Sequence, residues 1–169
     1  TQENAAVYYG MITLMDKHIG RIMDELDKQG MTDNTLIVFS ADHGEFLGDH
    51  GVWWKAIYAH DEMQKVPFIV SMPGTVAEGV QSSAPQSLVD LAPTWMDFAG
   101  LPKAIEFEGI SQKECWENPD KPARDRIIVE EHPFENFYST RTLVQNDYKM
   151  VFYMLLGKMD AEVERVLNK

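Results

Sequence analysis

Asp42, His43 and Gly44 stand directly after a short apolar run, Leu-Ile-Val-Phe, at residues 36–39. An unbroken run of this kind is typical of a strand covered on both faces, as in a parallel sheet. Ligands of such sheets bind just beyond the carboxyl ends of the strands, where Asp42 and His43 would emerge. A carboxylate oxygen and a neutral imidazole nitrogen both bind divalent cations. The sequence therefore predicts a metal site here, although Asp and Gly alone are also common in ordinary strand-ending turns.

Polar and aromatic residues suited to a binding site follow at close intervals. They are a Gly-Asp-His-Gly segment at 48–51, then Trp53, Trp54 and Lys55, and after a gap His60, Asp61 and Glu62. The stretch 45–58 is too irregular and too rich in glycine for one helix or strand, so we expect a long functional loop. Taken singly, each of these residues could equally be a solvated loop residue or, for the tryptophans, part of the core.

The order of these segments resembles the second half of the catalytic domain of the sulfatase family, in the alkaline phosphatase superfamily. The matching segments are Asp-His-Gly-Glu at 42–45, Gly-Asp-His-Gly at 48–51, Lys55, the acidic pair at 61–62, Val-Pro-Phe-Ile-Val at 66–70 with Pro-Gly at 73–74, Val-Asp-Leu-Ala-Pro-Thr at 89–94 and Ala-Gly-Leu-Pro at 99–102. The resemblance covers roughly residues 4–102, with a weaker similarity at 141–153. Several motifs in a fixed order are far more specific than any one of them.

The resemblance implies roles for three of these residues. Asp42 and His43 would hold a divalent cation, with calcium expected first and manganese or zinc as the alternatives that an imidazole ligand favours. Lys55 would contact the sulfate group and the nucleophile. Sulfatases make that nucleophile, a formylglycine, from Cys or Ser within C/S-x-P-x-R in the N-terminal half of the domain. Cys115 lacks the Pro and Arg of that motif. We therefore expect Cys115 to be a packing or surface residue, and the nucleophile and an acidic pair of metal ligands to lie upstream of Thr1.

Four further residues are weaker candidates for substrate contacts. His50, within the Gly-Asp-His-Gly segment, could orient a neighbouring group of the loop. His60 precedes the acidic pair, where the family often has Tyr, and could line the cleft. Trp54 could form an apolar wall for the substrate, and His132 could approach the cleft from the end of the strand expected at 127–129. A structural or surface role is the alternative for each of them.

The function that the resemblance implies is that of a sulfuric ester hydrolase, to which this chain contributes metal ligands and an anion-binding lysine. Many arylsulfatases have Asp-Asn where this chain has Asp42 and His43. The Asp-His pair also resembles members that hydrolyse phosphonate monoesters and phosphodiesters, so such a hydrolase is the alternative. A third hypothesis is a catalytically inert structural half-domain, because two ligands alone rarely bind calcium tightly. The expected partner is a sulfate ester, either a small molecule or a glycan.

The elements that must position these residues follow from the hydrophobic spacing. Apolar residues at helical intervals predict a helix over 5–28, which Gly30 ends, and a second helix over 88–99. A second buried strand is expected over 67–71. This alternation predicts an α/β fold with part of a mostly parallel sheet and helices on both of its faces.

Turn chemistry and polar residues predict a connector at 106–125. Residues 1–105 would then form the C-terminal portion of the α/β catalytic domain. Residues 126–169 would form a small antiparallel subdomain. Its expected elements are a strand at 127–129, a hairpin of 138–145 and 148–154 around Asn146 and Asp147, and the start of a C-terminal helix at 161–169.

The composition narrows the class of protein. The 169 residues carry a formal net charge of −12, which argues against binding to nucleic acid, and 44% of them are hydrophobic, as in a globular domain. No apolar run reaches the roughly 18 residues that span a bilayer. Thr1 is preceded by neither a methionine nor a signal peptide, so we expect an excised fragment. Half a sheet would expose an apolar edge, through which the fragment is expected to self-associate.

Overall fold

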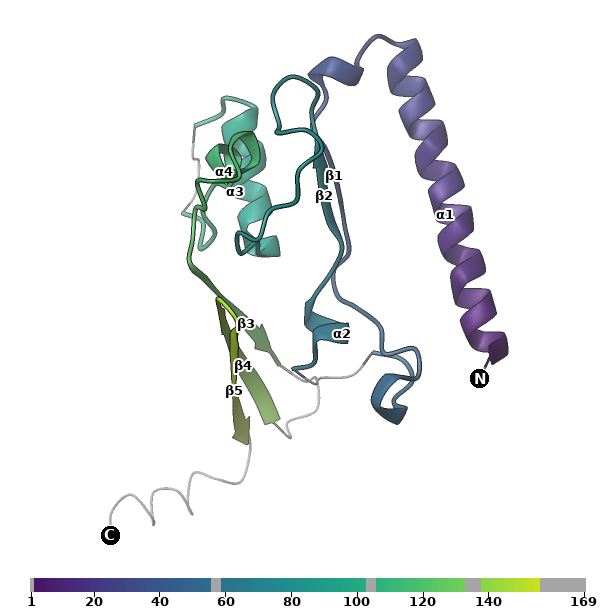
Figure 1. Cartoon of the computed structure of the whole chain (residues 1–169), viewed down its shortest axis with the longest axis vertical. Helices are drawn as coiled ribbons and strands as arrows, with labels where there is room; N and C mark the ends of the chain where they lie inside the picture. The colour runs from purple at the N-terminus through teal and green to yellow at the C-terminus, as the bar shows by residue number, and fades with distance from the viewer. Residues whose placement is uncertain (1, 56–58, 103–105, 133–137, 156–169) are drawn as a thin grey trace.

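The computed structural model describes residues 2–55, 59–102, 106–132 and 138–155 (Figure 1). Its elements in chain order are α1 (Gln2–Lys28), the 3₁₀ turn η1 (Thr32–Asn34), β1 (Ile37–Ser40), η2 (Asp49–Gly51), α2 (Asp61–Gln64), β2 (Phe68–Ser71), η3 (Leu88–Asp90), α3 (Leu91–Phe98), α4 (Lys113–Glu117), β3 (Arg126–Glu131), β4 (Tyr138–Gln145) and β5 (Tyr148–Leu155). This mixture of helices and strands, with a small antiparallel sheet near the C-terminus, confirms the predicted α/β class. The helix expected at 161–169 lies outside the described residues.

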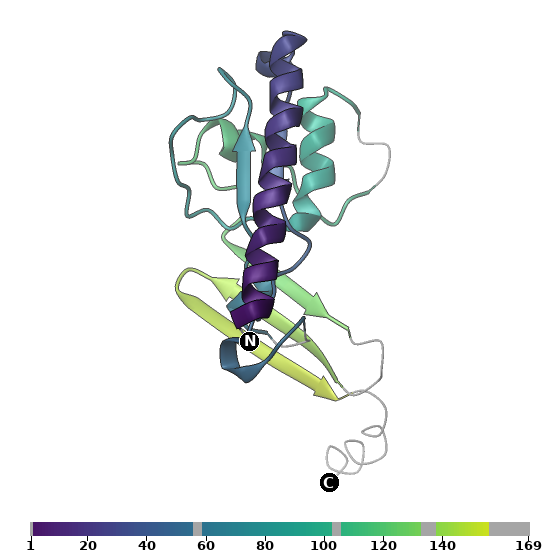
Figure 2. The ribbon, with the colours of Figure 1, turned by 90° about the vertical axis from the view of Figure 1, so that its right-hand side faces the viewer.

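The long helix α1 confirms the predicted first helix, and it ends where Gly30 adopts a left-handed φ of 64°. Glycine reaches that conformation without the steric cost of a Cβ. No residue of α1 is buried, and its apolar stripe is open, with Val7 63% and Leu14 57% exposed. The helix lies on the opposite side of β1 and β2 from α3 and α4 (Figures 1 and 2). Among the described residues, no helix is long and apolar enough to cross a membrane.

β1 and β2 pair antiparallel, with Ile37 opposite Ser71 and Ser40 opposite Phe68. The parallel relation that the sequence indicates is therefore not found between these two strands. The reason lies in the connection, whose described parts, 41–55 and 59–67, lie at the end of the sheet where β1 finishes (Figure 1). Parallel neighbours need a crossover that returns the chain to the opposite end. An antiparallel pair within an otherwise parallel sheet is common in large sheets.

Burial along the strands corrects the expectation that both are covered on two faces. β1 is half-buried along its length, whereas β2 alternates and its Ile69 is 61% exposed. The covered side of the pair packs on a small core that also includes Val76 and α4, where Cys115 is 2% and Trp116 6% exposed. Cys115 is therefore a packing residue. The stretch expected to be a polar connector thus contains a short helix that contributes to the core.

Asp90 is the centre of a buried polar network at the start of α3. Asp90 as a whole is 1% exposed, and its carboxylate accepts hydrogen bonds from the Ile110 backbone N–H at 3.0 Å and from Gln112 Nε2 at 2.8 Å. The same carboxylate pairs with the Arg124 guanidinium. Thr94 Oγ1 donates to the Asp90 carbonyl at 2.6 Å and accepts from the Gln112 backbone N–H at 2.9 Å. These bonds join α3 to α4 and to the segment that leads into β3.

The second sheet has the strand order β3-β4-β5, and both neighbouring pairs are antiparallel. Ile127 lies opposite Val144, and Gln145 lies opposite Tyr148 across the tight turn. Asn146 in that turn adopts a left-handed φ of 52°, which Asn tolerates better than most residues. The predicted strand and hairpin are confirmed.

Two side-chain hydrogen bonds tie α2 to this second sheet. Lys149 Nζ donates to Asp61 Oδ1 at 2.7 Å, and Gln64 Nε2 donates to Thr142 Oγ1 at 3.0 Å. The bond from Lys149 lowers the pKa of Asp61 below its ordinary value of 3.8. The Asp61 side chain is 68% exposed, so the pair contributes less than about 1 kcal/mol. That contribution is present above the ordinary pKa and is lost as the pH falls through the lowered pKa.

Candidate metal site and neighbouring cleft

Asp42 and His43 begin the connection after β1, and the fold brings their ligand atoms together. Asp42 Oδ1 accepts a hydrogen bond from the His43 backbone N–H at 3.0 Å, and Asp42 Oδ2 lies 3.7 Å from His43 Nε2. One divalent cation, with bonds of about 2.0–2.6 Å, can span that gap. The side chains are 88% exposed for Asp42 and 41% for His43. Both are therefore accessible to an ion and to its other ligands.

The backbone determines which nitrogen of His43 carries the proton. His43 Nδ1 lies 2.8 Å from the Gly44 carbonyl oxygen, and a carbonyl only accepts hydrogen bonds. Nδ1 must therefore donate, and in the neutral imidazole Nε2, the nitrogen that faces Asp42, then has the lone pair. A histidine held in this way is ready to bind a cation through Nε2.

Gly44 is needed because α2 approaches its backbone closely. Its N–H donates to the Met63 carbonyl at 2.9 Å, and a Cβ at position 44 would lie 1.7 Å from the Glu62 carbonyl oxygen. No side chain fits at that distance unless the backbone moves. The Asp42–His43 turn therefore rests directly on α2.

We expect Gly44→Ala to push the Asp42–His43 turn away from α2. Overpacking of this kind costs about 1–3 kcal/mol, and the shift would move the carbonyl that holds His43 Nδ1. The measurements are thermal unfolding and divalent-cation affinity of the full-length protein. Both the melting temperature and the affinity should fall.

Gly10→Ala is the matched control for this substitution. A Cβ at position 10 of α1 meets nothing within 4 Å, and alanine favours a helix over glycine by about 1 kcal/mol. Gly10→Ala should therefore leave stability unchanged or slightly raised. A Gly44→Ala protein that melts like the wild type would contradict the close-packing argument.

A cleft of about 810 Å³ opens beside the two ligands, between α2 and the second sheet. Its polar lining residues include His43 and the charged residues Asp42, Asp61, Lys65, Glu130 and Lys149. The cleft thus places cationic and anionic side chains next to the proposed metal ligands. A charged molecule bound to a cation at Asp42 and His43 would contact these side chains.

Three other sequence candidates are not among the described residues that line this cleft, although one of them, His132, directly follows the lining residue Glu131. Trp54, 77% exposed at a left-handed φ of 71°, and Lys55, also exposed, follow η2 on the loop. His132 follows β3, and its Nε2 lies 3.9 Å from Glu130 Oε2. None of these three belongs to the described residues that line the cleft. Their contacts with a substrate therefore stay predictions.

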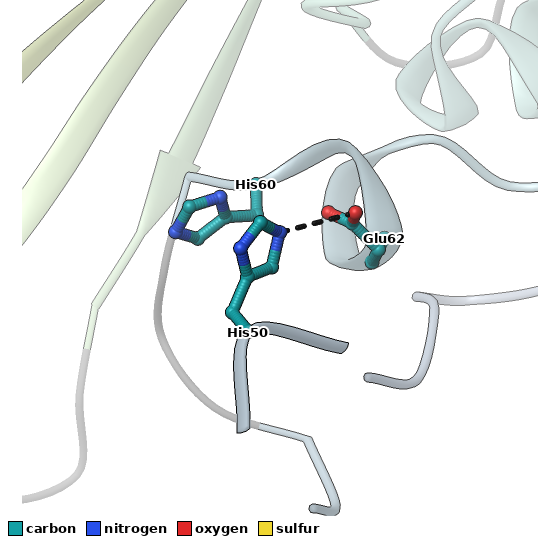
Figure 3. A group of neighbouring side chains, drawn as sticks. All are labelled: His50, His60 and Glu62. Atoms are coloured by element: carbon teal, nitrogen blue, oxygen red, sulfur yellow. Dashed lines mark hydrogen bonds and ion pairs between the residues drawn. The ribbon is translucent and has the colours of Figure 1, made fainter. Parts of the chain in front are cut away.

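His50, His60 and Glu62 form a second group of ligand atoms (Figure 3). His50 Nε2 lies 3.2 Å from Glu62 Oε1, and the His50 and His60 rings stack with their centroids 4.3 Å apart. A hydrogen bond from its own backbone, followed by the one from His50, lowers the pKa of Glu62. The fold therefore joins two sequence candidates that lie apart along the chain.

Glu62 and Lys149 were given no role of their own from the sequence, where Glu62 appears only as part of the acidic pair at 61–62. The acidic pair after His60 was a usable signal for Glu62, because a carboxylate beside a histidine is a common metal-ligand pattern. Lys149 had no such signal. Its partner Asp61 lies 88 positions earlier in the chain, so only the packing of the second sheet on α2 joins them.

Comparison with known proteins matches residues 1–101 to the family model described as Sulfatase. The N-acetylglucosamine-6-O-sulfatase of Bacteroides thetaiotaomicron is 36% identical over 155 residues, which cover 86% of this chain and 27% of that protein. The phosphonate monoester hydrolase of Agrobacterium radiobacter superposes with a TM-score of 0.78 at 28% identity, over 90% of this chain and 33% of that one.

A protein solved in complex with its substrate, D-glucosamine-2-N,6-O-disulfate, superposes with a TM-score of 0.73 at 27% identity. The match covers 93% of this chain and 37% of that one. The chain therefore spans between 27% and 37% of the length of these three relatives.

Proposed function

Because this chain belongs to the sulfatase family, we propose that it supplies part of the active site of a sulfuric ester hydrolase. The observation that carries the proposal is the pairing of Asp42 Oδ2 with His43 Nε2 at 3.7 Å, with Nδ1 engaged by the Gly44 carbonyl. In this proposal Asp42 and His43 hold a divalent cation, and Lys55 binds the sulfate group. Sulfatases generally use a divalent cation and a formylglycine.

The proposed roles follow from the charge that the reaction develops. Hydrolysis of a sulfate ester places negative charge on the equatorial oxygens and on the departing oxygen. A bound divalent cation supplies Lewis-acid stabilisation of that charge. Asp42 offers a hard anionic oxygen to hold the ion, and the neutral imidazole of His43, with Nδ1 bonded to the Gly44 carbonyl, offers the lone pair of Nε2. The Lys55 ammonium would neutralise charge on the sulfate oxygens.

Calcium is the ion that we propose first, with manganese and zinc as alternatives that the imidazole of His43 allows. Calcium takes about six to eight oxygen ligands. Within the described residues, no third His, Cys, Asp or Glu side chain joins Asp42 and His43. Further ligands would therefore come from water and from other parts of the protein. The formylglycine would also lie elsewhere, since Cys115 is buried in the core and lacks the required motif.

A phosphonate monoester or phosphodiester hydrolase is the second candidate function. The observation that favours it is the structural similarity, at a TM-score of 0.78, to the phosphonate monoester hydrolase of Agrobacterium radiobacter. The Asp42–His43 pair is compatible with both activities, because either ester class develops negative charge beside a divalent cation.

The test is steady-state hydrolysis of three esters by the full-length protein. The esters are N-acetylglucosamine 6-sulfate, chosen for the similarity to a sulfatase of that specificity, an aryl sulfate and an aryl phosphonate monoester. We expect kcat/KM for at least one sulfate ester to exceed that for the phosphonate by about 10²-fold, equivalent to roughly 3 kcal/mol of differential transition-state binding.

Each other outcome of this assay has a definite meaning. A higher kcat/KM for the phosphonate would replace the sulfatase proposal with the phosphorus-ester hydrolase. Turnover of none of the three esters by metal-loaded protein would favour the inert structural module.

A further inference from the structure

We propose that His50, His60 and Glu62 form a second cation site, which binds a transition-metal ion such as Zn²⁺. The site is separate from the cation proposed at Asp42 and His43. His50 comes from η2, whereas His60 immediately precedes α2 and Glu62 lies within it. The ion would therefore connect two segments of the long loop region.

The backbone directs these three side chains toward one point. His60 immediately precedes α2, and Glu62 lies in its first turn. His50 adopts a left-handed conformation, with φ of 54° and ψ of 16°, which is uncommon outside glycine but enriched for His, Asn and Asp. Figure 3 shows His50 reaching from its loop toward the side chain of Glu62, with His60 beside it.

The spacing of the donor atoms fits a single ion. A tetrahedral zinc ion with bonds of about 2.0–2.2 Å places its ligand atoms about 3.3–3.6 Å apart. His50 Nε2 and Glu62 Oε1 are 3.2 Å apart, and one donor atom from each of the three residues lies within 4.8 Å of the others. The His50 and Glu62 side chains are 49% and 32% exposed. Small rotations of these accessible side chains would close the remaining distance.

The chemistry of the donors selects the class of ion. Two imidazoles and one carboxylate form the ligand set of several zinc sites, and imidazole also suits copper and nickel. Calcium and magnesium instead prefer shells made of oxygen. The His50–His60–Glu62 site should therefore prefer transition-metal ions.

Phe46 gives this group an apolar base. Its side chain is fully buried, and its ring lies edge-to-face with both imidazoles, at centroid distances of 6.2 Å to His50 and 5.8 Å to His60. His50 and His60 are both exposed on the opposite side. Packing on Phe46 thus restricts the orientation of the two imidazole rings, and their exposed side leaves room for water as a fourth ligand of the ion.

An ion at this site would support the neighbouring turn without taking part in the reaction. Gly44 donates its N–H to the Met63 carbonyl at 2.9 Å, immediately after Glu62. An ion that joins the η2 loop to α2 would therefore stabilise the helix on which the Asp42–His43 turn rests. We expect higher thermal stability as its main effect.

The test is binding of cobalt(II), measured by visible absorption, to the untagged full-length protein carrying Asp42→Ala. That substitution removes a ligand of the other proposed site, so the result does not depend on the proposed function. Cobalt(II) accepts the nitrogen and oxygen ligands that zinc prefers. We expect saturable binding of about one equivalent with the absorption of a low-symmetry, nitrogen-containing site.

Two substitutions in this background identify the ligands. His50→Asn and Glu62→Gln should each weaken cobalt binding by about 10²-fold, because each removes one donor from the site. Asn tolerates the left-handed backbone at position 50, and Gln retains the shape of Glu62. His18→Asn is the control, since His18 is an exposed histidine of α1 whose ring contacts Arg21. It should leave cobalt affinity unchanged.

The melting temperature provides a second measurement. Excess zinc should raise it in the Asp42→Ala parent and in the His18→Asn control, but not after His50→Asn or Glu62→Gln. An Asp42→Ala parent that binds no cobalt would overturn the proposal. Unchanged cobalt affinity in either ligand variant would also overturn it, because the ion would then be bound elsewhere.

Discussion

Asp42→Ala in the full-length protein is expected to lower kcat/KM in the proposed hydrolysis of a sulfate ester by about 10³-fold or more, which corresponds to roughly 4 kcal/mol of transition-state stabilisation. Asp42 Oδ2 is the anionic oxygen beside His43 Nε2 and the proposed anionic ligand of the cation. Its loss would leave a neutral imidazole as this chain's contribution to the cation site. Steady-state kinetics over a range of calcium concentrations would measure the effect. Excess cation should restore part of the activity, since a weakened site still fills by mass action.

Asp49→Ala is the matched control for the metal-ligand substitution. Asp49 is an exposed carboxylate of the same loop region, at the start of η2, and its backbone groups bond to Phe46 and Val52. Its removal changes the net charge equally but takes no ligand from the proposed site, so turnover should stay close to that of the wild type. Wild-type turnover by Asp42→Ala would refute the metal-ligand role. Equal losses in both variants would indicate an effect of charge alone.

Asp90→Ala is expected to lower the free energy of unfolding by about 3–5 kcal/mol, because it leaves a largely buried guanidinium without its counter-ion. The Arg124 side chain is 18% exposed, and its partner carboxylate is 2% exposed. The Ile110 backbone N–H and Gln112 Nε2 would lose their acceptor as well. Equilibrium urea unfolding of the full-length protein would measure the change through the transition midpoint.

Asp97→Ala is the control for Asp90→Ala, because it removes an exposed carboxylate of α3 and not a buried one. Asp97 Oδ2 accepts a hydrogen bond from Ser111 Oγ at 2.6 Å, but both groups are exposed. Its removal should therefore cost no more than about 1 kcal/mol. Similar destabilisation by Asp90→Ala and Asp97→Ala would contradict the view that burial makes the Asp90 network important.

The Asp90 network also gives a structural role to the segment at 89–94, which was identified in the sequence only by its resemblance to sulfatases. The segment Val-Asp-Leu-Ala-Pro-Thr at 89–94 contains no residue of either proposed metal site. Two of its polar residues, Asp90 and Thr94, instead satisfy buried groups of the chain around Gln112. The motif therefore stabilises the scaffold beside the core.

Much of the local structure could be predicted from the sequence because it depends on neighbouring residues. The helical spacing of α1, its end at Gly30 and the hairpin turn at Asn146 are set by hydrophobic period and backbone preference. Asp42 and His43 are adjacent at the end of one strand, so their proximity needs no long-range contact. The packing role of Cys115 also agrees with one of the two alternatives that its surroundings in sequence allowed.

The tertiary structure alone decided which distant segments meet. The antiparallel pairing of β1 and β2 depends on where the connection between them runs. The bond between Asp61 and Lys149 joins residues 88 positions apart. His50 meets Glu62, and Gly44 meets α2, only because the loop region folds onto that short helix. Hydrophobic period and turn propensity describe a few neighbouring residues, whereas these contacts arise from the packing of whole elements against one another.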